Sequence, residues 1–239
     1  MMMGAPMAIA LGASTVITLV TTTSLGITTI ATACFSGLDS FPLLAVPFFI
    51  LAGNLMKFGG LSNKILEFAD ALVGHIKGSL GMVAVVASMF FAALSGSSPA
   101  TVSAIGSLTI PKMEEEGYDR AYATALNAAA GTIGVIIPPS IPFVIYGVVA
   151  NCSIADMFKA GILPGVLIGV VLMIVNYITV TKNGYGMKNH ANKHFSLRKL
   201  WHTLKDTWLA LMVPVIILGG IYAGIFTPTE SAVVGIVYT

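Results

Sequence analysis

The segment "SGSSPAT" (residues 95–101) lies between two strongly apolar stretches, "GMVAVVASMFFAAL" (81–94) and "VSAIGSLTIP" (102–111). Each arm is only about 10–15 residues long, whereas a helix needs ~20 residues to cross a bilayer. Two short arms joined by a polar tip predict a re-entrant helical hairpin, which enters and leaves the membrane on one side. The charged stretch "KMEEEGYDR" (112–120) then returns the chain to water.

Composition places the whole chain in a membrane. Of 239 residues, 56% are hydrophobic and only 9% are charged, with a mean hydropathy of +0.91. A soluble domain carries about 25% charged residues, so this chain lacks the charge to cover a water-exposed surface. We therefore expect an all-α integral membrane protein. The small net charge of +2 gives no reason to expect a nucleic-acid partner.

The distribution of charge predicts the order of membrane segments. An amphipathic stretch at 58–77 suits a helix lying in the membrane interface. The expected apolar crossings are within 5–34 and at 42–57, 121–150, 163–180 and about 209–225. If the basic loop 182–205 is cytoplasmic, eleven of the twelve Lys and Arg residues fall inside and only Lys159 falls outside. Because positive residues favour the cytoplasmic side, this agreement supports a hairpin over a full crossing at 80–111.

A second break, "GTIGVIIPPSIP" (131–142), interrupts the apolar stretch 121–150. Non-helical backbone at membrane depth survives only where protein or a water-filled cavity satisfies it, and paired discontinuous helices point to the sites of secondary transporters. Hydroxyls and helix C-terminal carbonyls suit Na⁺, whereas N-terminal amides suit a carboxylate. Asn127 lies one turn before Gly131 and is a further candidate for the same centre.

Other functions fit the residues less well. A serine nucleophile at the tip needs a base within hydrogen-bond reach, and the histidines fall in interfacial or loop segments: His75, His190, His194 and His202. The sequence contains neither an HExxH motif nor a P-loop. We therefore expect no enzyme; an ion channel or a non-transporting membrane scaffold remains an alternative. Cys34 and Cys152 form no recognisable ligand pattern.

Three long motifs in order resemble the large membrane subunit of TRAP (tripartite ATP-independent periplasmic) transporters. They are "FSGLDSFPLLAVPFFILAGNLM" (35–56), the stretch from "FADALVG" to "PFVIYG" (68–147), and "GIFTPTESA" (224–232). The resemblance implies an ion-transporter-superfamily fold with two inverted repeats and an elevator mechanism. It also implies Na⁺-coupled import of an organic acid across a bacterial inner membrane. The implied partners are a periplasmic binding protein and a small four-helix membrane subunit.

The same resemblance implies the site and the division of the chain. The predicted sodium ligands are the hydroxyls of Ser97 and Ser98 with backbone oxygens around Gly134 and Pro138. The supporting or cavity residues are Ser95, Gly96, Thr101, Asn127, Gly131, Thr132, Pro139 and Ser140. Residues 1–78 are expected to be scaffold, 79–162 to be transport domain (hairpin 79–112, interrupted helix 119–150), and 163–239 to be scaffold with the start of a second repeat.

The two ends of the sequence also lead to expectations. The chain stops inside an apolar helix after "TPTESAVVGIVYT", with Glu230 and Thr227 expected to cap that helix. The family pattern implies a second hairpin beyond Thr239 and a further helix before Gly4. The substrate stays open among sialic acid, a C4-dicarboxylate and a keto acid. Apart from sodium as coupling ion, we expect no cofactor.

Overall fold

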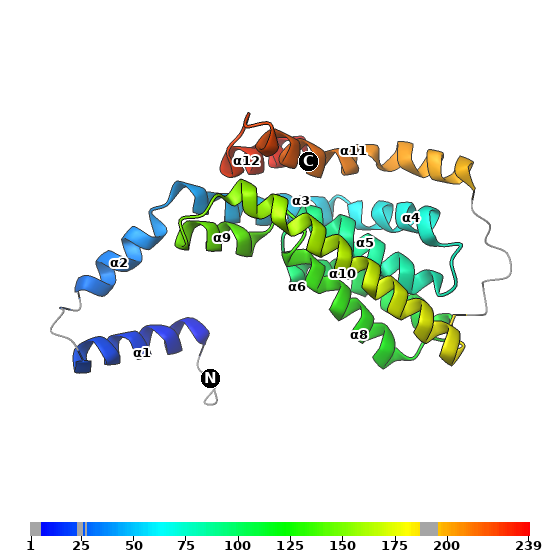
Figure 1. Ribbon diagram of the computed structural model, residues 1–239, viewed down its shortest axis with the longest axis horizontal. Helices are drawn as coiled ribbons and strands as arrows, with labels where there is room; N and C mark the ends of the chain where they lie inside the picture. The colour runs from blue at the N-terminus through cyan, green and yellow to red at the C-terminus, as the bar shows by residue number, and fades with distance from the viewer. Residues whose placement is uncertain (1–5, 23–25, 27, 187–195) are drawn as a thin grey trace. The chain divides into compact units, whose positions relative to one another are not determined.

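The computed structural model describes residues 6–22, 26, 28–186 and 196–239, and the regular structure in these ranges is helical (Figure 1). The expected all-α class is therefore confirmed. The chain divides into two compact units, residues 1–41 and 42–239. The first unit holds α1 (Met7–Thr22) and α2 (Thr28–Leu38). One apolar crossing was expected within 5–34, whereas the described residues form two helices, each shorter than 18 residues.

The second unit carries the interrupted segments. Its elements, in order, are η1 (Phe41–Leu44), α3 (Ala45–Phe58), α4 (Leu61–Val73), α5 (Ser79–Ser95), α6 (Ser98–Thr101), η2 (Val102–Gly106), α7 (Ser107–Glu115), α8 (Arg120–Gly131), η3 (Thr132–Val135), α9 (Ile141–Val149), α10 (Ile154–Asn183), α11 (Leu197–Tyr222) and α12 (Pro228–Tyr238). Three helical stretches are long and apolar enough to span a membrane: Phe41–Phe58, Ile154–Asn183 and Leu197–Tyr222.

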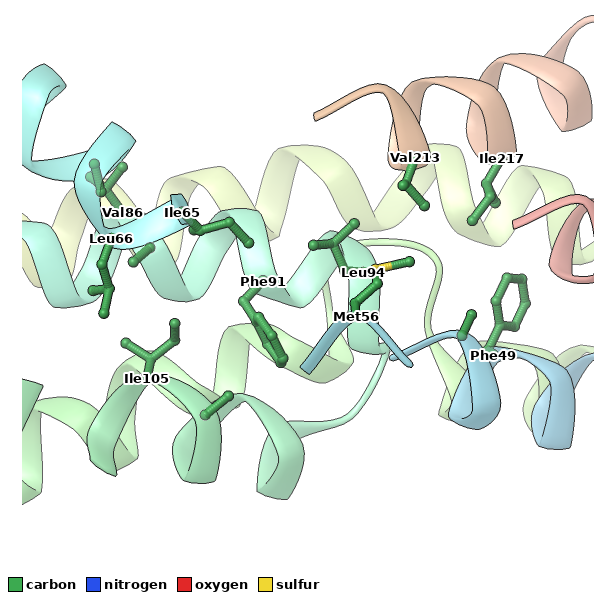
Figure 2. Packing of buried hydrophobic residues seen from close by; sticks show 14 of the residues in the cluster. Phe49, Met56, Ile65, Leu66, Val86, Phe91, Leu94, Ile105, Val213 and Ile217 are labelled. Carbon is green, nitrogen blue, oxygen red and sulfur yellow. The ribbon is translucent and has the colours of Figure 1, made fainter. Parts of the chain in front are cut away.

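Helix α5 is the centre of the packing. It is apolar on every side, and a helix of this kind is stable only when it is surrounded. One face joins a cluster with α3, α4 and α11, in which Phe91 and Leu94 lie near Met56 and Ile65 (Figure 2). The opposite face joins a second cluster with α7, α8 and α10, which includes Val85. The first arm of the expected hairpin is thus buried in protein.

The second arm turns back along the first. α6, η2 and α7 all pack against α5, and residues from the beginning of α5 (Leu80, Val83) line the same cavity as residues from α7 (Thr109, Lys112). A helical hairpin is therefore present. Its non-helical tip is shorter than the heptapeptide 95–101, because α5 runs through Ser95 and helix resumes at Ser98.

The second break also exists. α8 continues as the short 3-10 helix η3, residues 136–140 are not helical, and α9 begins at Ile141. Polar side chains start the helices that follow the breaks and turns, because they accept hydrogen bonds from backbone N–H groups left without helical partners. These N-caps are Asp119, Ser140, Ser153, Ser196 and Thr227. The expected capping box between Thr227 and Glu230 is present in full.

Two further helices hold this arrangement. α10 packs against α5, α8 and α9, and glycines spaced every four residues on one of its faces meet Phe143, Ile137 and Met89. Small residues in this pattern let membrane helices approach closely. α4 is amphipathic as expected, and its apolar face packs on α5 and α11.

Candidate cation site at the hairpin tip

The hairpin turns on a glycine and a closed set of hydroxyls. Gly96 has a φ of +58°, a left-handed conformation that L side chains rarely adopt. The buried hydroxyls of Ser95 and Thr101 lie 3.0 Å apart across the turn, and Thr101 Oγ1 also donates to the Ser97 carbonyl at 2.9 Å. The hydroxyls of Ser95 and Thr101 therefore hold the turn in shape through hydrogen bonds within it.

The interrupted helix wraps this turn. The Ile141 N–H donates to the Gly96 carbonyl at 3.3 Å. A side-chain carbon on Gly134 would lie 2.6 Å from Thr101 Oγ1 and 2.9 Å from the Ser97 carbonyl oxygen, so only glycine allows this approach. The structure thus brings together the two breaks that the sequence singled out.

Two hydroxyls at the tip are uncommitted. Within the described contacts, neither the Ser97 Oγ nor the Ser98 Oγ makes a hydrogen bond, and both residues are half-buried. Among the residues that the structure describes, no three His, Cys, Asp or Glu side chains come together as metal ligands. A cation at this tip would therefore be held by neutral oxygens, which suit a hard monovalent ion.

Three predicted residues lie elsewhere or do other work. Asn127 is buried and accepts from Thr109 Oγ1 at 2.7 Å, so its amide joins α8 to α7 rather than facing the tip. The Thr132 hydroxyl donates to the carbonyl of Ala129 in its own helix at 2.7 Å. Ser140 is fully buried, and its hydroxyl donates to the Val135 carbonyl at 2.6 Å, which closes the break.

The remaining predicted residues line the contact between tip and break. A side-chain carbon on Gly131 would overlap the side chain of Val102. Pro138 and Pro139 are both buried, and their shared peptide bond is cis. The Pro139 carbonyl faces Gly96, whose added side-chain carbon would lie only 2.6 Å from it.

Sequence reasoning missed the residues that clamp the base of the hairpin. Asn176 in α10 is fully buried; its amide donates to the Gly78 carbonyl at 3.1 Å and accepts from the Tyr122 hydroxyl at 3.0 Å. It therefore links α10 to the beginning of both α5 and α8. The signals were a single asparagine inside an apolar helix and the glycines at 161, 165 and 169.

A polar cavity of about 620 Å³ opens at the charged end of the hairpin, between α4, α5 and α7. Glu67, Asp70, Glu115 and Lys112 line it, and Lys199 pairs with Asp70 at 2.7 Å. The expected solvated acidic run 114–116 thus borders this cavity. It lies at the opposite end of the hairpin from the tip and is distinct from the candidate cation site.

Comparisons with known proteins identify the family of this chain. The family model of the tripartite ATP-independent periplasmic transporter, DctM component, matches residues 1–239. The chain is 48% identical over 238 residues to the isethionate TRAP transporter permease protein DctMQ of Oleidesulfovibrio alaskensis, covering 100% of this chain and 37% of that protein. It is 45% identical over 220 residues to the sialic acid TRAP transporter large permease protein SiaM of Vibrio cholerae, covering 92% and 51%.

A third relative is the C4-dicarboxylate TRAP transporter large permease protein DctM of Rhodobacter capsulatus, 39% identical over 252 residues, with 100% of this chain and 56% of the relative covered. The chain therefore spans about half the length, or less, of these curated relatives. The match nevertheless extends over both helical breaks and every helix that packs on them. The chain belongs to the DctM family, the large membrane components of TRAP transporters.

Proposed function

We propose that this chain forms one half of the transport path of a Na⁺-coupled permease that imports an organic acid. The observation that carries the proposal is the meeting of the hairpin tip with the broken helix. Within the described contacts the hydroxyls of Ser97 and Ser98 are free there, α5 and η3 both end at this point of the chain, and Gly134 of η3 closely approaches the Ser97 carbonyl. Helix C-termini carry partial negative charge and favour a cation.

Helix α10 supports placing this tip at membrane depth. Exposed apolar side chains run along it from Ile162 to Ile178, which is typical of a lipid-facing surface. The beginning of α5, at Gly78, is bonded to Asn176 near one end of that band, and Met89 packs on Gly169 near its middle. We therefore propose that the hairpin tip, about 9 Å beyond Met89, lies inside the membrane, as a re-entrant hairpin requires.

The same packing bears on the elevator mechanism that we propose. α10 contacts the hairpin and both halves of the broken helix, whereas α11 packs mainly on α4 and α12 and makes a smaller contact with α5. We infer that α10 moves with the hairpin, although the sequence division placed 163–239 with the scaffold. The moving part would then carry the cation site past α3, α4, α11 and α12.

The substrate class is an organic anion. Relatives are named as permeases for isethionate, sialic acid and C4-dicarboxylates, and these share a negatively charged group. We propose that a periplasmic binding protein delivers the acid and that a small four-helix membrane subunit completes the complex in a bacterial inner membrane.

Reconstituted uptake tests this function. The complete permease, its small subunit and its binding protein are placed in proteoliposomes, and uptake of labelled sialic acid, succinate and isethionate is measured with and without an inward Na⁺ gradient. We expect uptake of one acid that depends on the gradient. Uptake that is the same with and without the Na⁺ gradient would exclude the coupling. Flux that does not saturate with substrate and does not require the binding protein would indicate a channel.

A serine pair localises the cation. Ser98→Ala is expected to raise the Na⁺ concentration for half-maximal uptake severalfold, because it removes one neutral ligand. Ser107→Ala is the matched control, since that hydroxyl lies on the second arm and donates to the Ala104 carbonyl at 3.3 Å. Equal Na⁺ dependence in wild type and Ser98→Ala would remove Ser98 from the site.

A further inference from the structure

One lysine of the second unit hydrogen-bonds to a hydroxyl of the hairpin. Lys57, in the last turn of α3, donates from its Nζ to the Ser103 hydroxyl at 3.3 Å. Arg120, Lys159 and Lys199 each pair with a carboxylate. Lys57 has no such carboxylate partner within the part of the chain that the structure describes. An unpaired ammonium at this position is available to bind an anion.

The level of the Lys57–Ser103 pair along the hairpin distinguishes it. Ser103 lies six residues after Ser97 on the returning arm, and Met89 lies six residues before Ser95 on the first arm. Because the arms run in opposite directions, Ser103 and Met89 are at about the same level. Met89 packs on Gly169, in the middle of the lipid-facing band of α10. The Lys57 ammonium therefore lies level with the middle of this band, and not at the cytoplasmic side to which the charge distribution assigned it.

Its immediate surroundings agree with that depth. Phe58 is 87% exposed and Leu55 is 42% exposed, so apolar side chains flank Lys57 on α3, while Lys57 and Ser103 are themselves exposed. One turn earlier, Gly53 meets the hairpin tip: a side-chain carbon there would lie 3.2 Å from Ser95 Cα. A charged residue within a membrane is costly and is a functional-site hypothesis by default.

Beyond Ser98 at the tip, Ser103 is the hydroxyl of the described returning arm whose hydrogen remains open to a ligand. Thr101 and Ser107 each donate to a backbone carbonyl three or four residues earlier, and Thr109 shares its hydrogen between the Ile105 carbonyl and Asn127 Oδ1. Ser103 instead accepts from Lys57, so its own hydrogen is free to donate outward. It also lies in η2, a π-helical turn, and such turns occur frequently at functional sites.

We propose that Lys57 and Ser103 form the subsite that binds the acidic group of the transported organic anion. This deepens the proposed function and rests on it. The ammonium supplies the charge and one donor, and the Ser103 hydroxyl supplies a second donor beside it. A lysine is a point charge without the planar fork of arginine, so the subsite accepts a carboxylate or a sulfonate alike. The cation site at the tip lies about 9 Å further along the same hairpin.

Direct binding tests the subsite independently of transport. The complete permease complex is placed in nanodiscs of phosphatidylcholine, whose headgroups carry no net charge, with Na⁺ present. Half-saturating concentrations of succinate and of ethanesulfonate are read from the rise in unfolding temperature with ligand concentration. We expect Lys57→Gln to raise both values at least tenfold, the order expected for loss of a charge-assisted hydrogen bond. Lys64→Gln, which removes an exposed charge from α4, is expected to leave both unchanged.

Chemical rescue separates charge from structure. In a background without Cys34 and Cys152, both exposed free thiols, Lys57→Cys is treated with 2-aminoethyl methanethiosulfonate, which restores an ammonium, or with methyl methanethiosulfonate, which does not. Only the first reagent should restore anion binding.

Four results would overturn the proposal: no binding of either anion by wild type, equal affinities in wild type and Lys57→Gln, an equal loss in Lys64→Gln, or rescue by the neutral reagent. Na⁺-driven uptake of an organic acid with an unchanged half-saturating concentration in Lys57→Gln would refute the subsite and leave the proposed function standing. Absence of all such uptake in wild type would instead refute the proposed function.

Discussion

Gly96→Ala is the sharpest test of the contact between the hairpin tip and the broken helix. Two costs add at this position. The left-handed φ of +58° costs an alanine about 1 kcal/mol. The added carbon would also lie 2.6 Å from the Pro139 carbonyl oxygen, a backbone atom that cannot rotate away. Overpacking of this kind costs about 1–3 kcal/mol, so the total expected loss is about 2–4 kcal/mol.

A second glycine isolates the contact from the backbone conformation. Gly224 has a φ of +69° with nothing within 4 Å of the position of its added carbon. Gly224→Ala should therefore lose only the stability that the left-handed backbone conformation costs an alanine. For a chain of this size, 1 kcal/mol shifts the unfolding temperature by about 2–4 °C. Thermal unfolding of the purified 239-residue chain in detergent should therefore fall at least twice as far for Gly96→Ala as for Gly224→Ala. Equal shifts would show that the tip does not press on the break, which would refute the geometry of the candidate site.

Three other changes test the surrounding packing and capping. Asn176→Leu should destabilise the chain by about 1–2 kcal/mol; combined with Tyr122→Phe in a double-mutant cycle followed by thermal unfolding, the two losses should be less than additive, and full additivity would contradict the hydrogen bond. Gly169→Leu should lower the unfolding temperature because its side chain overlaps Met89, and Met89→Ala should restore part of the loss; no restoration would contradict that contact. Hydrogen bonds from Thr227 lower the pKa of Glu230, so the stability contributed by its ionised form is present above the ordinary carboxyl pKa and is lost as pH falls through the lowered value. Glu230→Gln should remove this loss of helix signal from an acid titration followed by circular dichroism. A loss that persists in Glu230→Gln would assign it to another group.

The breaks were predictable because they rest on local chemistry. Consecutive prolines without N–H groups, glycines and a run of hydroxyls interrupt helices wherever they occur, so both interruptions were located from the sequence. The extent of the tip was overestimated. Ser98 and Pro99 were assigned to the polar turn, but serine and proline are also favourable at the first positions of a helix, and helix resumes there.

Long-range contacts could not be read in the same way. Asn127 is one turn from Gly131 and lies on the same side of α8, which suggested a shared centre, yet its amide accepts a hydrogen bond from Thr109 of α7. The partner of Lys57 lies 46 residues away, and no local pattern indicates such a pairing. Sequence spacing fixes which face a residue occupies, whereas the opposing face comes from a different part of the chain.

The burial of α5 on all sides has a consequence for how the protein is made. α10, which covers one face of α5, is complete only about 90 residues after α5 ends. At a synthesis rate of about 5–20 residues per second, the hairpin waits roughly 4–18 seconds for that cover. Throughout this interval only α7 and α8 cover that side of the short first arm, and the insertion machinery must shelter the part that α10 will cover. A ribosome that stalls before residue 154 would therefore leave a substrate for membrane quality control rather than a folded intermediate.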